Sequence, residues 1–402
     1  METDDSTCNG LENMEIEDEG FSLVEKPKND GTQIADPSDL KFTEVPVSAE
    51  YLKKAKTIKD YLDATENPTI EKLRGFAISD GGLINDDLRK TAWPGLLGIT
   101  RDSIEPAPSV AQLRSHPEFG QVVLDVNRSI KRFPPGIPYD QRVALQEQLT
   151  NLILRVITKY PHLRYYQGYH DVAITILLVV GEDMAFRIME KLSTEHLRDC
   201  MEPTMEKTSY LLNYIFPLIN HLSPEVYRHV DKSGAGTMFC LPWFLTWFGH
   251  SLNHYKDVVR LYDFFLASPP LMPLYLTATI VCYRKTEVLA AECNMASIHC
   301  LLSQLPDELP FEQLIVQAMK LYKELPPQNA EAAVKDRIKK EKALRDAEDA
   351  ARKAVVRRNR FRGLQRQLER LVPNSRAQLF ILAVSFAVGL YAYIANSDYP
   401  IR

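Results

Sequence analysis

Residues 119–133 read FGQVVLDVNRSIKRF, and the apolar side chains of this stretch recur at the spacing of a helix. The next apolar stretch repeats that spacing with Leu145, Leu149, Leu152, Ile153, Val156 and Tyr160. Short proline-containing breaks, at 134–136 and 269–270, separate such stretches. The sequence contains no convincing run of alternating strand residues and no repeat of fixed period. We therefore expect an all-α fold.

Composition and charge limit the classes of protein to which this chain can belong. The chain has 402 residues, of which 45% are hydrophobic, and this is enough to fill a sizeable core. Its formal net charge of −5 at pH 7 argues against a nucleic-acid-binding protein. The six cysteines form no CxxC pair, so we expect reduced, buried thiols of the cytosol. The N-terminal stretch is polar and acidic, and a signal peptide is not expected there.

The sequence divides into five expected parts. Residues 1–50 are acidic and poor in large apolar side chains, which predicts disorder. Residues 51–325 carry the helical pattern and form the expected folded domain. Residues 326–376 are rich in Ala, Glu, Lys and Arg and predict a charged linker helix. A transmembrane helix is expected at 377–396, followed by a short lumenal tail at 397–402.

The segment 377–396 has the length and composition of a membrane span. No charged residue lies between Arg376 and Asp398, and twenty helical residues cover about 30 Å, the thickness of the hydrocarbon core. Its apolar side chains favour insertion by about 4 kcal/mol. Arginines on the N-terminal flank place that side in the cytosol, so a tail-anchored protein inserted after translation is expected. Another apolar run, 238–248, is too short to span a membrane and predicts a core helix.

The linker helix has two halves of different character. The first half lacks a wide apolar stripe and is expected to be solvated. The second half places Phe361, Leu364, Leu368 and Leu371 on one face, with arginines around them. A basic amphipathic helix beside a span favours contact with anionic headgroups. A charged spacer helix explains the same composition equally well, and both interpretations stay open.

Three strings occur in order along the helical region: RKTAWPGLLG at 89–98, VVLDVNR at 122–128 and YYQG at 165–168. Together they resemble the signatures RxxxWPxLLG, IxxDxxR and YxQG of the TBC-domain Rab GTPase-activating proteins. Later residues agree with the family's second-half pattern: Trp243, Phe244, Trp247, Phe248 and then Leu261-Tyr262-Asp263. The resemblance covers about residues 60–320 and implies a TBC domain of two helical lobes.

The resemblance also implies roles for individual residues. Arg128 corresponds to an arginine finger, which neutralises charge on the transferred phosphoryl group of a GTP-bound Rab. Gln167 corresponds to a glutamine finger, whose amide can orient the attacking water. Both would act in trans, so the chain would be an activator of a GTPase rather than an enzyme itself. The supporting residues are Asp125, Tyr165, Gly168, Arg89 and Trp93; Asp125 would hold the finger, whereas Trp93 would be a core aromatic residue and Arg89 its ion-paired neighbour.

Simpler interpretations of the same residues remain open without the resemblance. Asp125 and Arg128 are three positions apart on the polar face, together with Arg132, and would also fit a surface ion pair. Gln167 would also fit a loop amide that caps a helix. The chain departs from the family pattern at Val122 for Ile, Ser129 for Thr and His170 for a common Asn; none of these removes a catalytic group.

Other chemistries have weaker support in the sequence. His250 and His254 have the spacing of a zinc-binding helix but lack the Glu of HExxH. The chain has no GxxxxGK[ST] phosphate loop, so GTP and Mg²⁺ are expected on the partner and no cofactor on this chain.

The resemblance implies a GTPase-activating protein for a Rab of early secretory, ER-to-Golgi traffic, held in the endoplasmic reticulum membrane, with the Golgi as a second compartment. One alternative is a tail-anchored adaptor that binds a Rab without activating it, which would need neither finger. A membrane metallohydrolase is a third hypothesis and lacks a complete ligand set. The sequence does not name the Rab.

Overall fold

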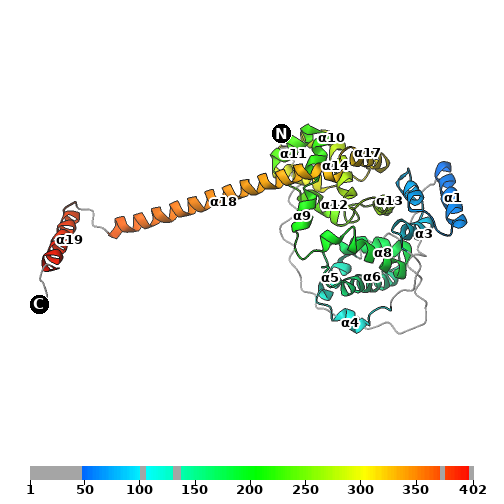
Figure 1. The fold of residues 1–402 in the computed structure, drawn as a ribbon, viewed down its shortest axis with the longest axis horizontal. Coiled ribbons are helices and arrows are strands. Elements are labelled where there is room, and N and C mark those ends of the chain that lie inside the picture. The colour runs from blue at the N-terminus through cyan, green and yellow to red at the C-terminus, as the bar shows by residue number, and fades with distance from the viewer. Residues whose placement is uncertain (1–47, 100–105, 130–136, 372–375, 398–402) are drawn as a thin grey trace, which may run out of the picture. The chain divides into compact units, whose positions relative to one another are not determined.

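The computed structural model describes residues 48–99, 106–129, 137–371 and 376–397. Within these ranges the chain forms helices joined by turns, with no strand, which confirms the all-α prediction there (Figure 1). The helices are α1 (Ala49–Ala64), α2 (Ile70–Ile78), α3 (Asp86–Leu96), α4 (Val110–Arg114), α5 (Phe119–Arg128), α6 (Tyr139–Lys159), α7 (Tyr169–Val180), α8 (Glu182–Thr194), η3 (Arg198–Met201), α9 (Glu206–Leu212), α10 (Ile215–Leu222), α11 (Pro224–Ser233), η4 (Met238–Cys240), α12 (Leu241–Leu245), α13 (Tyr255–Leu266), α14 (Met272–Tyr283), α15 (Lys285–Ala290), α16 (Met295–Ser303), α17 (Phe311–Glu324), α18 (Pro327–Leu371) and α19 (Arg376–Ser397).

The helices pack in two groups. In the first, α6 contacts α4, α5, α7 and α8, and α7 also contacts α3 and α5. In the second, α14 contacts α10, α12, α15 and α17, while α10 also contacts α11 and α18. Helix α13 contacts α2 and α3 and so joins the second half of the domain to its beginning. Since α7 is surrounded by other helices, nearly every side chain along it is buried.

A buried carboxylate ties α13 to the N-terminal helices. Asp263 on α13 has no exposed surface and accepts hydrogen bonds from Arg89 Nε at 3.0 Å and from Trp93 Nε1 at 2.8 Å. The backbone N–H of Leu83 also donates to it at 3.0 Å. Burial by itself would lower the pKa of Arg89, but the charges of Asp263 and Asp86 raise it above its usual value. Arg89 and Trp93 are therefore parts of the core.

Replacing Asp263 by alanine is expected to lower the free energy of unfolding by about 3–5 kcal/mol, because Arg89 is left as a buried charge without its main partner. The matched control is Glu225→Ala, which removes the exposed ion pair between Glu225 and Lys285 and should cost less than about 1 kcal/mol. Urea denaturation of both variants measures the difference. An equal decrease in the free energy of unfolding in the two variants would show that the Asp263 cluster stabilises the fold no more than an exposed ion pair does.

Most of the apolar run 238–248 is buried, as expected, although Met238 and Pro242 are exposed, and the prediction of one continuous core helix is wrong. The chain forms η4 and the short α12, and then Trp247 and Phe248 adopt left-handed backbone angles, with φ of 47° and 66°. The N–H of Phe248 donates to the carbonyl of Trp243 at 2.9 Å, a turn that ends the helix. This turn directs both rings into the core, where each packs on Phe265. Burial of the two aromatic rings offsets the cost of the backbone angles.

The first turns of α18 pack on the domain rather than being solvated. Ala330 and Val334 are buried, and the Arg337 guanidinium lies 3.3 Å from the centre of the Phe216 ring while it pairs with Asp231. Such a guanidinium stacks on the ring and keeps its charge paired. From residue 342 to residue 364 all side chains are exposed, including the apolar Val355, Val356, Phe361 and Leu364.

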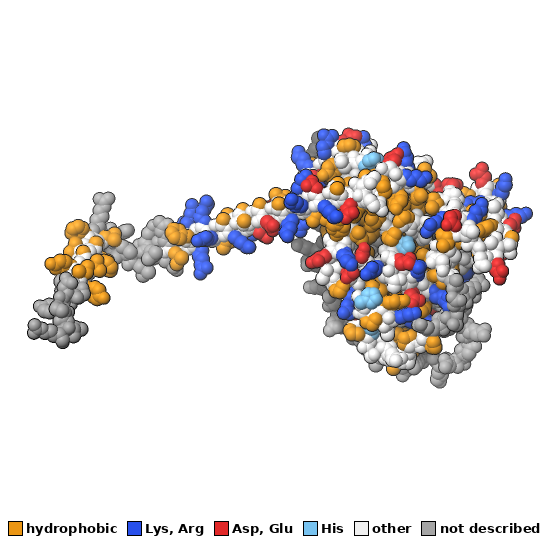
Figure 2. Space-filling view, viewed as in Figure 1, with side chains coloured by type: hydrophobic (Ala, Val, Ile, Leu, Met, Phe, Trp, Pro, Cys, Tyr) orange, Lys and Arg blue, Asp and Glu red, His pale blue; other side chains and the backbone are white. Residues whose placement is uncertain are grey.

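Helix α19 carries apolar side chains that are exposed throughout residues 379–394, and Figure 2 shows them at the surface of the helix. Among the residues that the structure describes, no helix is both long enough and apolar enough to cross a membrane. Residues 1–47 of the predicted disordered segment and residues 398–402 of the predicted tail lie outside the described residues.

Candidate functional site

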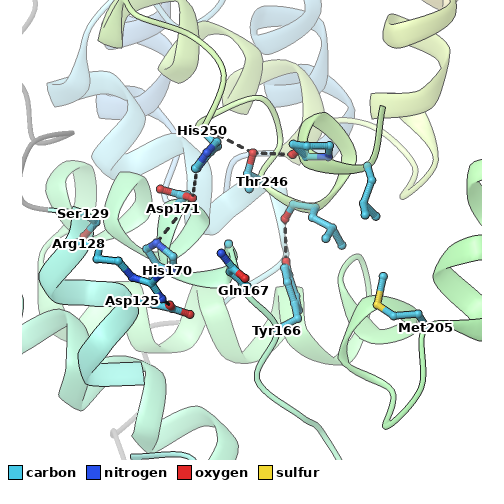
Figure 3. Close-up of a pocket in the computed structure, with 14 residues that line it drawn as sticks. Asp125, Arg128, Ser129, Tyr166, Gln167, His170, Asp171, Met205, Thr246 and His250 are labelled. Atoms are coloured by element: carbon cyan, nitrogen blue, oxygen red, sulfur yellow. Dashed lines mark hydrogen bonds and ion pairs between the residues drawn. The ribbon is translucent and has the colours of Figure 1, made fainter. Parts of the chain in front are cut away.

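A pocket of about 590 Å³ brings together three segments that are distant in sequence, with Met205 from a fourth place in the chain. One wall is the end of α5, the second is the turn before α7 with the first residues of that helix, and the third is the segment 241–250 (Figure 3). The lining residues are Asp125, Arg128, Ser129, Tyr166, Gln167, Gly168, His170, Asp171, Met205, Leu241, Pro242, Leu245, Thr246 and His250. Both predicted fingers, Arg128 and Gln167, face this pocket.

Arg128 is the last residue of α5, and its side chain is 66% exposed. Its Nη2 donates to Asp125 Oδ1, and its Nε contacts the carbonyl of Leu124 at 3.4 Å. Both partners belong to the preceding turn of the same helix, so they hold the guanidinium beside the helix end. An exposed guanidinium fixed in this way can meet an anion on a second molecule without first reorganising.

The structure places Asp125 inside the protein, which corrects its expected position on an exposed polar face of the helix. Only 2% of the residue is exposed, and besides Arg128 it accepts hydrogen bonds from Gln121 Nε2 and from the Tyr165 hydroxyl, each at 3.0 Å. The helix containing Asp125 ends at Arg128, and residues 130–133 of the expected longer helix, Arg132 included, lie outside the described residues. A buried carboxylate with three donors is a fixed anchor for the arginine.

Tyr165 connects α5 to the segment before α7. Burial and then the negative charge of Asp125 raise the pKa of Tyr165 well above its usual value, so its phenol stays protonated and can donate. The backbone N–H of Tyr165 donates to Glu118 Oε2 at 3.1 Å, at the start of α5. Tyr165 thus holds both ends of the helix that carries Arg128.

Gln167 is exposed in the turn that Gly168 closes. Gly168 has φ of +104°, and a Cβ atom there would lie 2.8 Å from Thr246 Cγ2. The neighbouring Tyr166 hydroxyl donates to the Leu245 carbonyl at 2.9 Å. Glycine is therefore required at 168 both by the backbone angle and by the close approach of the 241–250 segment. These contacts hold the turn in place and leave the Gln167 amide at the pocket.

Arg89 and Trp93 do not line the pocket. Both lie in the Asp263 cluster, so their place in this structure is to join α3 to α13. The first of the three strings therefore contributes to the Asp263 cluster, whereas the second and third strings contribute to the pocket.

Sequence reasoning missed a group of polar residues in the pocket wall. Asp171 is buried, and its Oδ2 lies 3.1 Å from His250 Nδ1 and 3.7 Å from His170 Nε2. Asp171 follows the YxQG string closely in the sequence, and this proximity is the feature that could have identified it as a pocket residue. His250 does not lie on a helix with His254, and among the described residues no cluster of His, Cys, Asp and Glu could hold a metal ion.

The pocket also has an apolar wall, formed by Met205, Leu241, Pro242 and Leu245. Met205 is 45% exposed and precedes α9, whereas the other three belong to α12. No sequence pattern links Met205 to the finger residues, because their proximity depends on how the two groups of helices pack.

Comparison with known proteins agrees with this arrangement. The family model of the Rab-GTPase-TBC domain matches residues 86–289, which include the three strings and the pocket. The bovine protein named TBC1 domain family member 20 is 44% identical over 355 residues, which cover 85% of this chain and 88% of that protein. The fission yeast protein named GTPase-activating protein gyp10 is 33% identical over 268 residues, covering 65% of this chain and 71% of that protein.

A solved structure supports the fold. The crystal structure of the Ypt/Rab-GAP domain of Gyp1p superposes with a TM-score of 0.53 and covers 67% of this chain and 97% of that domain. The two sequences are 14% identical, so this likeness concerns the arrangement of helices.

Proposed function

We propose that this chain, which belongs to the Rab-GTPase-TBC domain family, accelerates GTP hydrolysis by a Rab protein. The observation that carries the proposal is the pairing of Arg128 and Gln167 on two different elements at one open pocket. The names of the relatives support it, since one of them is called a GTPase-activating protein. The partner is a GTP-bound Rab, which brings GTP and Mg²⁺ with it, and the chain supplies no cofactor of its own.

The mechanism assigns a separate task to each finger. The Arg128 guanidinium approaches the transferred phosphoryl group and neutralises the charge that builds up on it. The Gln167 amide donates and accepts hydrogen bonds, and so it orients the water that attacks this group. Asp125 and Tyr165 keep Arg128 in position before the partner arrives, so less ordering is needed at the moment of reaction.

A Rab-binding adaptor without catalytic activation is the alternative. An adaptor would need a complementary surface but no exposed arginine held by a buried carboxylate beside a fixed glutamine turn. Single-turnover GTP hydrolysis across a panel of Rab proteins, with the full-length chain in detergent, separates the two. We expect strong acceleration for a small subset of Rabs, particularly those of early secretory traffic. Binding to a Rab without any acceleration across the panel would favour the adaptor.

We also propose that residues 377–396 anchor the chain in the endoplasmic reticulum membrane, with the domain in the cytosol. The support is the uncharged run between Arg376 and Asp398 and the exposed apolar side chains of α19 at 379–394. The arginines of α18 between 352 and 366 would face anionic headgroups. The Golgi is a second compartment for the same anchor.

Removing residues 372–402 is expected to leave activation in solution unchanged, because no pocket residue lies in that segment. On Rab held at a vesicle surface, the truncated chain should be less efficient, since tethering raises the effective concentration. In cells it should lose its reticular distribution. Carbonate extraction of the full-length chain is the direct assay, and release into the soluble fraction would show that the segment does not span the membrane.

A further inference from the structure

We propose that His170 is a positioning residue for Arg128, because it orients the Tyr165 hydroxyl toward Asp125. The inference rests on the proposed role of Arg128 in GTP hydrolysis. His170 occupies the position where the family commonly has Asn, and its imidazole lies against the Tyr165 hydroxyl.

The Tyr165 hydroxyl has a single proton and two neighbours that could share it. Its oxygen lies 3.0 Å from Asp125 Oδ2 and 2.9 Å from His170 Nδ1. A buried carboxylate can only accept, so the phenol donates its proton to Asp125. The same phenol oxygen must then accept from the imidazole. The geometry therefore assigns a proton to Nδ1 of His170.

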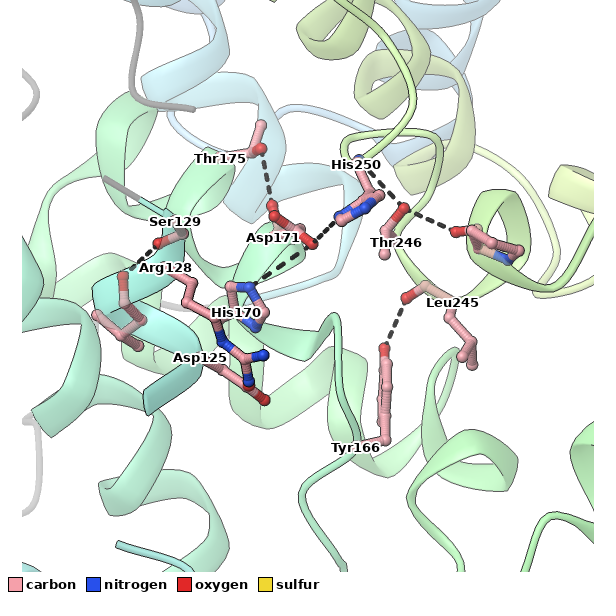
Figure 4. A network of polar contacts seen from close by, with 12 residues as sticks. Asp125, Arg128, Ser129, Tyr166, His170, Asp171, Thr175, Leu245, Thr246 and His250 are labelled. Atoms are coloured by element: carbon pink, nitrogen blue, oxygen red, sulfur yellow. Dashed lines mark hydrogen bonds and ion pairs between the residues drawn. The ribbon is translucent and has the colours of Figure 1, made fainter. Parts of the chain in front are cut away.

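The opposite edge of the His170 ring faces a second buried carboxylate. Nε2 of His170 lies 3.7 Å from Asp171 Oδ2, and His250 Nδ1 lies 3.1 Å from the same oxygen. Figure 4 shows the ring between Asp125 with Arg128 on one side and Asp171 with His250 on the other. The His170 side chain is only 10% exposed. The ring thus has little freedom to turn, and its Nδ1 stays directed at the phenol.

Three successive contacts connect His170 to Arg128: His170 with Tyr165, Tyr165 with Asp125, and Asp125 with Arg128. Because the His170 Nδ1–H donates to the phenol oxygen, the proton of the Tyr165 hydroxyl is directed to its hydrogen bond with Asp125. With Asp125 held, its other oxygen remains directed at Nη2 of Arg128. Without the donor at Nδ1, the hydroxyl is free to rotate, and Asp125 loses one of the hydrogen bonds that keep it in place. His170 acts through Tyr165 and Asp125, so its effect should appear in the rate of hydrolysis rather than in Rab binding.

The test compares two substitutions of His170 in the full-length chain. In His170→Leu the donor is lost, and the saturating rate of Rab-bound GTP hydrolysis should fall roughly ten- to a hundredfold, as expected for a misplaced catalytic group. In His170→Asn a side-chain N–H can reach the phenol oxygen, and the rate should stay within about threefold of the parent chain. Affinity for GTP-bound Rab and the thermal midpoint should change little in either variant. His221→Leu, at an exposed histidine on α10, is the matched control.

A double-mutant cycle shows whether the effect passes through Tyr165. In a Tyr165→Phe background, His170→Leu should cause little further loss, because the hydroxyl that His170 orients is already absent. Independent losses that multiply would overturn the positioning role. So would a His170→Leu variant that hydrolyses at the parent rate, or one in which Rab affinity falls and the saturating rate does not.

A measurement without GTP hydrolysis separates this inference from the proposed function. Nitrogen NMR of histidine-labelled full-length chain in detergent reports which ring nitrogen carries a proton. The inference expects a protonated Nδ1 for His170 in the parent chain and a changed signal in Tyr165→Phe. An unprotonated Nδ1 would overturn the inference, whereas a protonated Nδ1 in a chain that activates no Rab would overturn the proposed function instead.

Discussion

Replacing Arg128 by lysine is expected to lower the stimulated rate of GTP hydrolysis about a thousandfold, or roughly 4 kcal/mol in the barrier. Lysine keeps the positive charge but not the planar fork that contacts Asp125 and that, in the proposed mechanism, meets the phosphoryl oxygens. Binding of GTP-bound Rab should survive, since the exposed side chain contributes mainly when charge develops on the phosphoryl group. Single-turnover hydrolysis at saturating concentration measures the rate, and binding is measured separately.

Arg228→Lys is the matched control for this substitution. Arg228 is exposed near the middle of α11, and its Nε contacts the carbonyl four residues earlier at 3.2 Å, as Arg128 Nε contacts that of Leu124. It lies outside the pocket, so the rate should not change. Activity close to that of the parent chain in Arg128→Lys would remove Arg128 from the mechanism.

Replacing Gln167 by alanine should have its largest effect on a Rab whose own switch glutamine has been mutated. If Gln167 orients the water, the parent chain should still activate that Rab substantially. Gln167→Ala should then abolish this activation, a loss of about a hundredfold or more. Gln304→Ala, at an exposed glutamine after α16, provides a control outside the pocket.

Complete resistance of the mutated Rab to the parent chain would count against a glutamine supplied in trans. Equal activity of Gln167→Ala and the parent chain on that Rab would do the same. In either case Arg128 alone would carry the activation, and the turn around Gly168 would be a structural feature of the pocket.

The spacing of apolar residues along the sequence predicts individual helices of this fold and the faces that they bury. The apolar residues of 145–160 recur every three or four positions, and the structure buries Leu145, Leu149 and Ile153 along α6. The motif strings single out Arg128 and Gln167, and the structure brings the two residues to one pocket. Helical spacing alone does not relate them, whereas the family resemblance does.

Contacts between distant segments explain the predictions that failed. Asp125 is buried because the Tyr165 hydroxyl reaches it from 40 residues away, and helical spacing does not show this. The run 238–248 breaks because Trp247 and Phe248 pack on Phe265, which lies on another helix. The place of Met205 in the pocket wall likewise depends on tertiary packing, which overrides local pattern.

The central claim is that this chain supplies an arginine and a glutamine to the hydrolytic transition state of a Rab. The most direct measurement is complex formation with Rab·GDP in the presence of aluminium fluoride, which mimics the transferred phosphoryl group. We expect a stable complex that requires aluminium fluoride and is lost in both Arg128→Lys and Gln167→Ala. A complex that forms equally well without aluminium fluoride, or that persists undiminished in both variants, would contradict the central claim.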